Sequence, residues 1–196
     1  MALLSRFAAC VVKRRSWMSS SESALVVLVP EAEVLVKAFR DKYDPSAAAG
    51  MPAHITLLYP FKPPAELDAD VLESLHNCFA RFVPFSYSLA AVRRFPSEVL
   101  YLAPEPDVRF RDLTLAICER YPERPPYGGK FADVIPHLTV AQVQNEYELD
   151  RIAEDFAMAA IGMLPITASA VDVALMDNRS GDWQIHDVCA IGRMQR

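Results

Sequence analysis

The tripeptide His-x-Thr occurs twice in this 196-residue chain, each time within a short apolar segment of strand-like composition. The two copies lie in HITLLYPF, which begins at His54, and in PHLTVAQV, which contains His137, 83 residues further along the chain. The whole chain has four histidines and four threonines, and half of each kind lies in these two tripeptides. A motif repeated in this way predicts a duplicated fold in which both copies take the same structural position.

The segments around the two motifs follow the same order in each half of the chain. Apolar spacing and Pro/Gly-rich breaks predict strand, helix, loop, His-x-Thr strand, helix and strand, twice over. The first half is expected to end near Phe95 with the strand FSYSLAAVRRF. The segments LPITASAVDVALMD and DWQIHDVCAIG are expected to be two strands joined by the turn NRSG. The two motifs thus occupy the same place in a duplicated unit.

The strand period determines which side chains of each motif act together. Residues i and i+2 of a strand point to one face, so His54 and Thr56 share a side, as do His137 and Thr139. The apolar residues between them then point the other way, into a core. If the two halves pack with the motif faces opposed, two imidazoles and two hydroxyls surround one point.

This set of groups suits phosphodiester cleavage. Imidazole has an ordinary pKa near 6.5, so one ring can accept a proton from water while the other donates one to the leaving oxygen. Threonine hydroxyls can donate hydrogen bonds to the non-bridging phosphate oxygens. The scheme requires no metal, and the histidines and cysteines show no metal-ligand spacing, so neither a metal nor another cofactor is expected.

On the two motifs, and on the segment RRFPSEVLYLAPEP between them, the sequence resembles the 2H phosphoesterase superfamily, over roughly residues 23 to 193. The resemblance is in particular to the 2′-5′ RNA ligase-like and cyclic phosphodiesterase branches. It implies an α+β fold that is bilobal, with duplicated β-α-β-α-β units and two antiparallel sheets enclosing a central cleft. It also implies that 23–196 form one domain, with lobes built around His54 and His137 as catalytic residues and with Thr56 and Thr139 as phosphate-binding residues.

The activity implied by the resemblance is metal-independent opening of 2′,3′-cyclic, or related cyclic, phosphates of nucleotides or RNA ends, which would make the chain a hydrolase. Two alternatives stay open, namely a non-catalytic module that binds an AMP-like nucleotide and an RNA 2′-5′ ligase. The expected partner is therefore a cyclic nucleotide or an RNA terminal phosphate. Which histidine is the base and which the acid depends on how the substrate is oriented.

Three further residues are candidates for substrate binding. Tyr59 lies where some relatives place a substrate-binding aromatic, but strand parity turns it away from His54 unless the chain bends near Pro60. Tyr127 and Lys130 lie in the glycine-containing loop before the second motif, where an aromatic could stack on a base and a cation could meet phosphate. The alternatives are packing for Tyr59 and solvent-exposed loop positions for the other two.

Charge limits the kind of nucleic acid that the chain can bind. From Glu22 onward there are 16 basic and 25 acidic side chains. Proteins that follow an extended nucleic-acid tract present a basic face, because their affinity comes largely from neutralised phosphates. The balance favours a small phosphate compound, or only the end of an RNA, and a monomer is expected.

The first 22 residues are apolar, basic and serine-rich, and they are free of acidic residues up to Glu22. This composition is typical of an organelle targeting segment, and also of a flexible leader or of an extension from an upstream start codon. The four cysteines are scattered without paired spacing, which favours reduced thiols and a cytoplasmic location. No apolar run reaches the roughly 18 residues that a membrane helix requires, so no membrane partner is expected.

Overall fold

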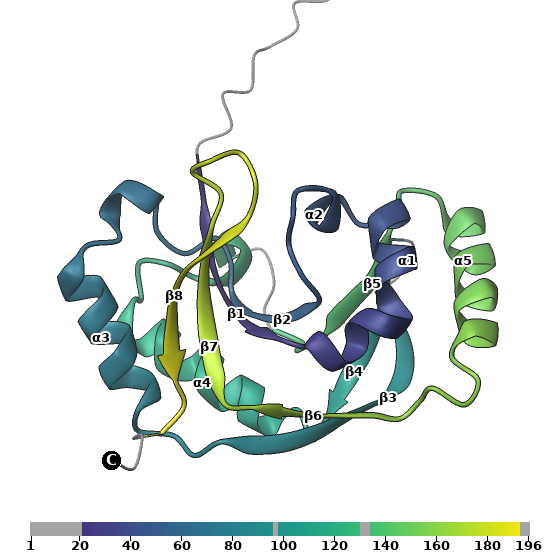
Figure 1. The fold of residues 1–196 in the computed structure, drawn as a ribbon. Coiled ribbons are helices and arrows are strands. Elements are labelled where there is room, and N and C mark those ends of the chain that lie inside the picture. Colours follow the sequence, from purple (N-terminus) through teal and green to yellow (C-terminus); the bar gives the residue numbers. More distant parts are fainter. Residues whose placement is uncertain (1–20, 96–97, 130–133, 193–196) are drawn as a thin grey trace, which may run out of the picture.

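The computed structural model describes residues 21–95, 98–129 and 134–192, and these form two four-stranded antiparallel sheets with helices packed on them (Figure 1). Sheet A has the strand order β2-β1-β7-β8 and sheet B the order β5-β4-β3-β6. The predicted α+β fold with two antiparallel sheets is confirmed. The strands are β1 (Ser23–Leu28), β2 (His54–Leu58), β3 (Phe85–Phe95), β4 (Val99–Glu105), β5 (Leu138–Gln142), β6 (Ile166–Ala170), β7 (Asp172–Asp177) and β8 (Gln184–Ala190). The helices are α1 (Glu33–Tyr43), α2 (Pro45–Ala48), α3 (Ala69–Phe79), α4 (Val108–Arg120) and α5 (Glu146–Ala159), with short 3₁₀ turns η1 (Pro30–Ala32), η2 (Pro64–Glu66) and η3 (Pro126–Gly129).

The two halves of the chain exchange strands between the sheets. Strand β3, which the sequence places at the end of the first half, pairs with β4 and β6 in sheet B. In return β7, from the second half, pairs with β1 and β8 in sheet A. The segment 164–177 is therefore not one strand, as the sequence predicts, but two strands that separate at Val171 and join different sheets. Its apolar pattern is continuous, so nothing local marks the change of sheet.

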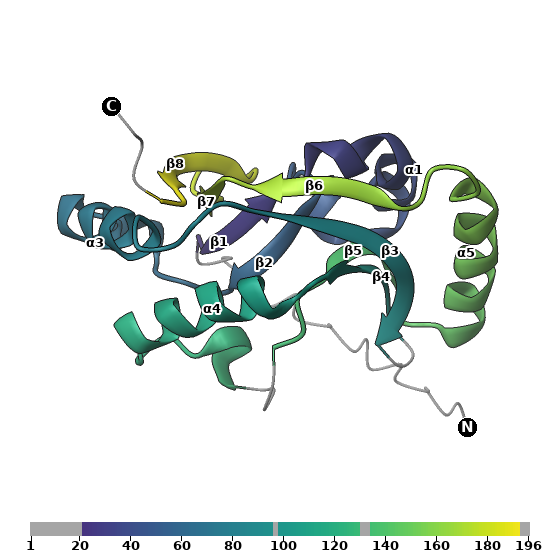
Figure 2. The ribbon, with the colours of Figure 1, turned by 90° about the horizontal axis from the view of Figure 1, so that it is seen from below.

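The helices also cross between the halves. Helix α1, from the β1–β2 connection, packs against β5 of sheet B, whereas α4, from the β4–β5 connection, packs against β2 of sheet A. Helices α3 and α5 lie at opposite ends of the molecule (Figures 1 and 2). Helix α3 begins at Ala69, because the Asp68 side chain accepts the Val71 N–H at 2.9 Å, and its apolar stripe buries Leu75 and Phe79.

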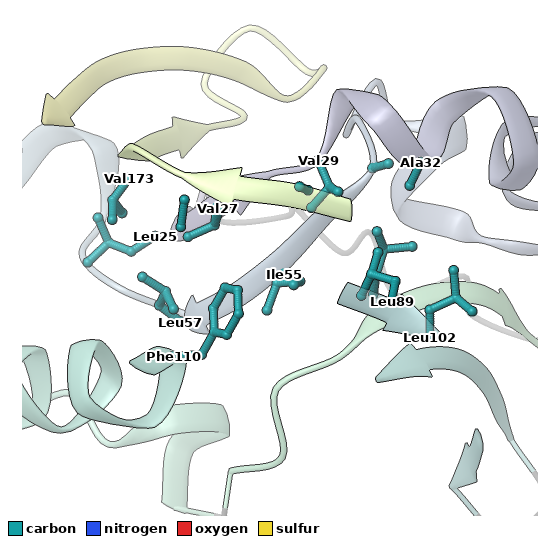
Figure 3. Packing of buried hydrophobic residues seen from close by; sticks show 14 of the residues in the cluster. Leu25, Val27, Val29, Ala32, Ile55, Leu57, Leu89, Leu102, Phe110 and Val173 are labelled. Carbon is teal, nitrogen blue, oxygen red and sulfur yellow. The ribbon is translucent and has the colours of Figure 1, made fainter. Parts of the chain in front are cut away.

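One hydrophobic core runs through both sheets (Figure 3). Leu25 and Val27 of β1 meet Ile55 and Leu57 of β2, and the cluster continues to Leu102 of β4. The apolar residues of both motif strands are buried in it, as predicted, and they are Ile55, Leu57, Leu138 and Val140. Burial of each large side chain contributes about 1.5–3 kcal/mol, which fixes the face that each motif strand turns away from the core.

Within the described residues, no helix is long and apolar enough to cross a membrane. Cys78, Cys118 and Cys189 are free thiols. The residues 1–20 of the predicted leader lie outside the described part. Glu22, at its end, is joined to the fold, because its backbone N–H donates to Asn178 Oδ1 at 2.6 Å. The cytoplasmic location, the monomeric state and the single domain remain predictions.

Candidate active site

The two His-x-Thr motifs lie where the two sheets meet. Strand β2 is an edge strand of sheet A, β5 is an edge strand of sheet B, and these two edges contact each other. His54 is the first residue of β2, and His137, where the sequence predicts the second motif strand to begin, directly precedes β5. All four motif side chains, His54, Thr56, His137 and Thr139, are half-buried, on the faces opposite the core. Duplication has thus placed equivalent polar pairs side by side.

Each motif is followed by a β-bulge at the same position. On β2, Thr56 pairs with Val26 and Leu58 pairs with Leu25, so that Leu57 is the additional residue. On β5, the same shift leaves Val140 as the additional residue. A bulge reverses the alternation of side chains beyond it, so the two residues after each threonine are both buried in the core.

The two imidazoles are held in the same way. Nδ1 of His54 lies 2.7 Å from the carbonyl oxygen of Pro52, and Nδ1 of His137 lies 2.8 Å from that of Ile135. A carbonyl oxygen only accepts hydrogen bonds, so Nδ1 carries the hydrogen in both rings and Nε2 is the free basic nitrogen when the ring is neutral. Neither Nε2 has a hydrogen-bond partner among the described residues. Both rings are therefore prepared to accept or donate a proton at Nε2.

The surroundings lower the proton affinity of both rings. The pKa of His54 is lowered from 6.5 to about 4, mainly by desolvation, and Arg40 and His137 contribute to this lowering. The bond to the Pro52 carbonyl and the charge of Asp44 act against it. Desolvation also lowers the pKa of His137, against a smaller opposite effect of its bond to the Ile135 carbonyl. Without a ligand both rings are mainly neutral at pH 7.

Tyr127 reaches the first motif from the loop before the second. Its backbone N–H donates to the carbonyl of Tyr59 at 2.6 Å, and its side chain hydrogen-bonds with Thr56. Burial raises the pKa of the Tyr127 hydroxyl, and the bond with Thr56 acts against that rise. The residue has φ of 52°, an unfavourable backbone conformation for a tyrosine. Tyr127 thus lies at the site, whereas Lys130 is outside the described residues.

Tyr59 lies on the motif face, because the bulge at Leu57 reverses its direction. Its ring packs with Val26, the pairing partner of Thr56, and lies edge-on to Trp183 with centroids 6.2 Å apart. Its hydroxyl donates to Glu22 at 2.6 Å. Burial, followed by the bond to Glu22, raises the pKa of Tyr59 to about 12, so the hydroxyl keeps its proton. The bulge thus supplies the departure from strict alternation that a role for Tyr59 at the site requires, and substrate binding by Tyr59 stays a prediction.

Comparison with known proteins identifies the family. The model of the 2′-5′ RNA ligase superfamily matches residues 28–182, most of the chain and both motifs. The chain belongs to this superfamily. The resemblance to the 2H phosphoesterases is thereby confirmed.

Individual relatives of this 2H phosphoesterase are distant. A Bacillus cereus protein, provisionally named a phosphoesterase, is 27% identical over 184 residues, which are 86% of this chain and 96% of the relative. The structure of Escherichia coli LigT complexed with 3′-AMP is similar with a TM-score of 0.55 at 14% identity, covering 88% of this chain and 99% of LigT. The Thermus thermophilus protein TT0787 has a TM-score of 0.58 at 17% identity, covering 89% and 100%. Both structures share the fold.

Two aromatic residues that contact the second motif were not predicted from the sequence. Phe95 of β3 and Tyr101 of β4 stack on each other, with centroids 4.4 Å apart and planes 27° apart. The ring of His137 meets both edge-on, at 4.9 Å from Phe95 and 5.4 Å from Tyr101. Tyr101 pairs with Thr139 on one side and with Arg93 on the other, and Phe95 lies two residues after Arg93. The strand pairing, once known, therefore places both rings on the motif face.

A buried ion pair holds the segment that precedes His54 in the chain. Arg40 Nε lies 3.0 Å from Asp44 Oδ2 with both side chains 3% exposed, and Arg40 Nη2 donates to the Met51 carbonyl at 3.0 Å. The other carboxylate oxygen of Asp44 accepts the N–H of Ser46 at 2.9 Å. These bonds fix the segment between α1 and β2, which delivers His54 to the site.

Other polar clusters lie away from the motifs. Among the described residues, one group has metal-ligand chemistry and spacing, namely His76, Asp187 and Cys189. It joins α3 to β8 on the core side of sheet A, three strands from β2. A groove of about 740 Å³ between α3 and α4 mixes Arg81 and Arg120 with acidic side chains and touches neither motif. Neither the cluster nor the groove includes a residue of the two motifs.

Proposed function

We propose that the chain is a phosphodiesterase that opens 2′,3′-cyclic, or related cyclic, phosphates of nucleotides or RNA ends by acid–base catalysis with His54 and His137. The observation that carries this proposal is the matched anchoring of the two imidazoles, which leaves one Nε2 from each sheet free beside a threonine. The LigT structures complexed with 3′-AMP and with phosphate support a nucleotide phosphate as the ligand class.

In this scheme the chain supplies proton transfers and charge stabilisation, and it requires no metal. One Nε2 takes a proton from water as the water oxygen attacks phosphorus. The other Nε2 donates its proton to the ribose oxygen that leaves, which gives a phosphomonoester. Thr56 and Thr139 donate hydrogen bonds to the non-bridging oxygens, where negative charge increases. The base ends protonated and the acid neutral, and exchange with solvent restores both.

We assign the base to His54 and the acid to His137. Support comes from the pKa of His54, lowered to about 4, which keeps its Nε2 unprotonated over the working range. For His137, desolvation lowers the pKa without a contribution from a neighbouring cation among the described residues, which favours it as the group that is protonated in the complex. A bound phosphate anion raises the proton affinity of both rings, so the acid gains its proton in the complex.

The proposal is tested by incubating chelator-treated protein with 2′,3′-cyclic nucleotides and separating 2′- from 3′-monophosphates by chromatography. We expect a single isomer, with turnover reduced by about 10²–10⁴-fold in His54→Ala and in His137→Ala, because each variant removes one proton transfer. His76→Ala, which alters a histidine outside the site, is the control and should retain full turnover. A nucleotide that binds but is returned unchanged would reject the enzyme in favour of a binding module.

A further inference from the structure

A cleft of about 460 Å³ lies on the motif face of sheet B, next to the segment that leads into His137. Its lining includes Arg93 of β3, Tyr101 of β4, and Ile135 and Pro136, the two residues before His137. Ligand sites in proteins have volumes of roughly 300–1,000 Å³. The cleft is continuous with the site because Tyr101 belongs to its wall and also contacts the His137 ring.

Arg93 brings a cation to this cleft without an acidic partner. It pairs with Tyr101 across the β3–β4 ladder, so the two side chains share the motif face. Arg93 is exposed and forms no hydrogen bond or ion pair with any described residue. The next residue, Arg94, points to the other face and pairs with Asp150, and Arg111 on the opposite wall is bound to Asp107 at 2.8 Å. A guanidinium with free donors matches the geometry of phosphate oxygens.

The strand register gives the spacing between Arg93 and the site. Tyr101 pairs with Thr139, and Arg93 pairs with Tyr101, so the backbones of Arg93 and Thr139 are two strand spacings, about 10 Å, apart. The Arg93 side chain stands roughly perpendicular to the sheet on the motif face, so the register keeps its guanidinium at about this spacing from Thr139. This separation suits a second phosphate one ribose away from a reacting phosphate bound by Thr139.

The far end of the cleft limits how many phosphates follow. Glu105 and Asp107 line that end, beyond Arg93. The negative charge of Glu105 opposes a third phosphate, in agreement with the acidic balance of the chain after Glu22, whereas the charge of Asp107 is balanced by Arg111. The charge pattern favours one additional phosphate rather than an extended strand.

We infer, building on the function proposed above, that Arg93 and this cleft bind a second phosphate of the substrate, one ribose away from the cyclic phosphate. The substrate class is then a nucleotide or short RNA end with phosphate on its 5′ side, rather than a nucleoside 2′,3′-cyclic phosphate with a free 5′ hydroxyl.

The test compares kcat/KM for four substrates that end in the same 2′,3′-cyclic nucleotide: with 5′ hydroxyl, with 5′ phosphate, as a dinucleotide and as a trinucleotide. We expect at least a tenfold preference for a second phosphate and less than about a threefold further gain from a third nucleotide. Arg93→Gln should bring the preference close to one, and Arg93→Lys should restore part of it. Arg94→Gln, whose side chain faces away, is the matched control and should keep the full preference. The 5′-phosphate and dinucleotide arms separate a free nucleotide from an RNA end.

Salt dependence provides a second reading of the same contact. Each neutralised phosphate of a single strand contributes a slope of about −0.7 to the logarithm of affinity against the logarithm of salt. The slope for the dinucleotide should exceed that for the 5′-hydroxyl substrate by about this amount, and Arg93→Gln should remove the difference.

The outcomes separate the inference from the proposed function. Turnover of all substrates with equal kcat/KM, or with equal effects of Arg93→Gln and Arg94→Gln, would overturn the inference and leave the activity standing. If no substrate turns over, calorimetry with a nucleoside 2′-phosphate and its dinucleotide equivalent decides. Tighter dinucleotide binding that Arg93→Gln abolishes would support the cleft and reject the activity, whereas equal binding would reject both.

Discussion

At the scale of single residues, both imidazoles are anchored at Nδ1 and differ in what surrounds the ring. His54 lies near Arg40, which adds to the lowering of its pKa. His137 lies beside the stacked rings of Phe95 and Tyr101, and no neighbouring cation among the described residues adds to the lowering of its pKa. Equivalent positions in a duplicated fold thus share one anchor and have different neighbours, and a difference in proton affinity between them is what one base and one acid in a single reaction would require.

These pKa directions predict an acidic pH optimum for kcat/KM. The base must be neutral and the acid protonated in the free enzyme, and the pKa of His54 is lowered to about 4 while that of His137 lies below its ordinary 6.5. We expect kcat/KM to rise through the region of pH 4 and to fall about tenfold per pH unit above the second pKa. The profile for kcat should fall at higher pH, because the bound phosphate favours the protonated ring. If the fall in kcat/KM began only above pH 7, this result would contradict the lowered pKa of His137.

The base and acid roles can be separated by a leaving group that needs no proton. On a 2′,3′-cyclic nucleotide we expect His137→Ala and His54→Ala each to lose about 10²–10⁴-fold in kcat/KM. On a nucleoside p-nitrophenyl phosphodiester, whose phenolate leaves unaided, His137→Ala should recover most of its loss and His54→Ala should not. Release of p-nitrophenolate, followed by absorbance, measures both. The reverse pattern would exchange the two roles.

At the scale of elements, the β-bulge after each motif decides which side chains join the site. It turns Leu57 and Leu58 together into the core and brings Tyr59 back to the motif face. The sequence predicted the strand and the inward direction of Ile55, because both follow from local alternation. The direction of Tyr59 could not be predicted, because a bulge depends on the pairing with β1. The aromatic pair of Phe95 and Tyr101 was missed for the same reason, since it depends on the register of three strands.

Helix α4 stabilises the bulge of β2 across the halves of the chain. The buried Thr114 hydroxyl donates to the carbonyl of Leu57, the additional residue, at 3.2 Å. Thr114→Val keeps the shape and leaves this acceptor unsatisfied, so we expect a loss of about 1–3 kcal/mol in the free energy of unfolding, measured with urea. Thr167→Val, at an exposed position of β6, is the matched control and should stay within about 0.5 kcal/mol. Equal effects of the two variants would exclude a role for the hydroxyl.

The loop that leads into β2 depends on its buried ion pair. Arg40→Ala would leave the Asp44 carboxylate, 3% exposed, without its counter-charge, and we expect a loss of about 3–5 kcal/mol in the free energy of unfolding. Lys37→Ala removes the partner of Asp41 on the same helix at the same i,i+4 spacing, but that pair is exposed and should contribute less than about 0.5 kcal/mol. Thermal melts of both variants provide the comparison. A small effect of Arg40→Ala would mean that water replaces the guanidinium.

At the scale of the whole molecule, the halves are interlocked. The sequence correctly predicted the duplication and the two motif positions, since both follow from a repeated local pattern. It did not predict that β3 and β7 change sheets or that α1 packs on β5, because such exchanges leave the order of elements unchanged. Sheet A, which carries the first motif, therefore packs against α4 of the second half, and sheet B, which carries the second motif, packs against α1 of the first half. The site lies at the seam, so its geometry depends on both halves being folded.

Because the two halves are interlocked, we expect sheet A and sheet B to unfold together in a single transition. Phe156 of α5 is fully buried beside sheet B, with its ring 5.1 Å from that of Phe39 of α1, whereas Trp183 packs on the motif face of sheet A. In a Trp17→Phe background, Trp183 fluorescence reports sheet A alone. We expect Phe156→Ala to lower the free energy of unfolding reported by Trp183 by about 3–5 kcal/mol, although the mutation lies beside the other sheet.

Met158→Ala, at a position 70% exposed on the same helix, is the matched control and should change the free energy of unfolding by less than about 0.5 kcal/mol. Circular dichroism, which follows both sheets and the helices, should give the same midpoint as Trp183 in every variant. If Phe156→Ala shifted the circular dichroism transition and left that of Trp183 in place, the sheets would unfold independently. The two histidines would then be aligned only by the contact between β2 and β5, and not by the exchange of strands and helices.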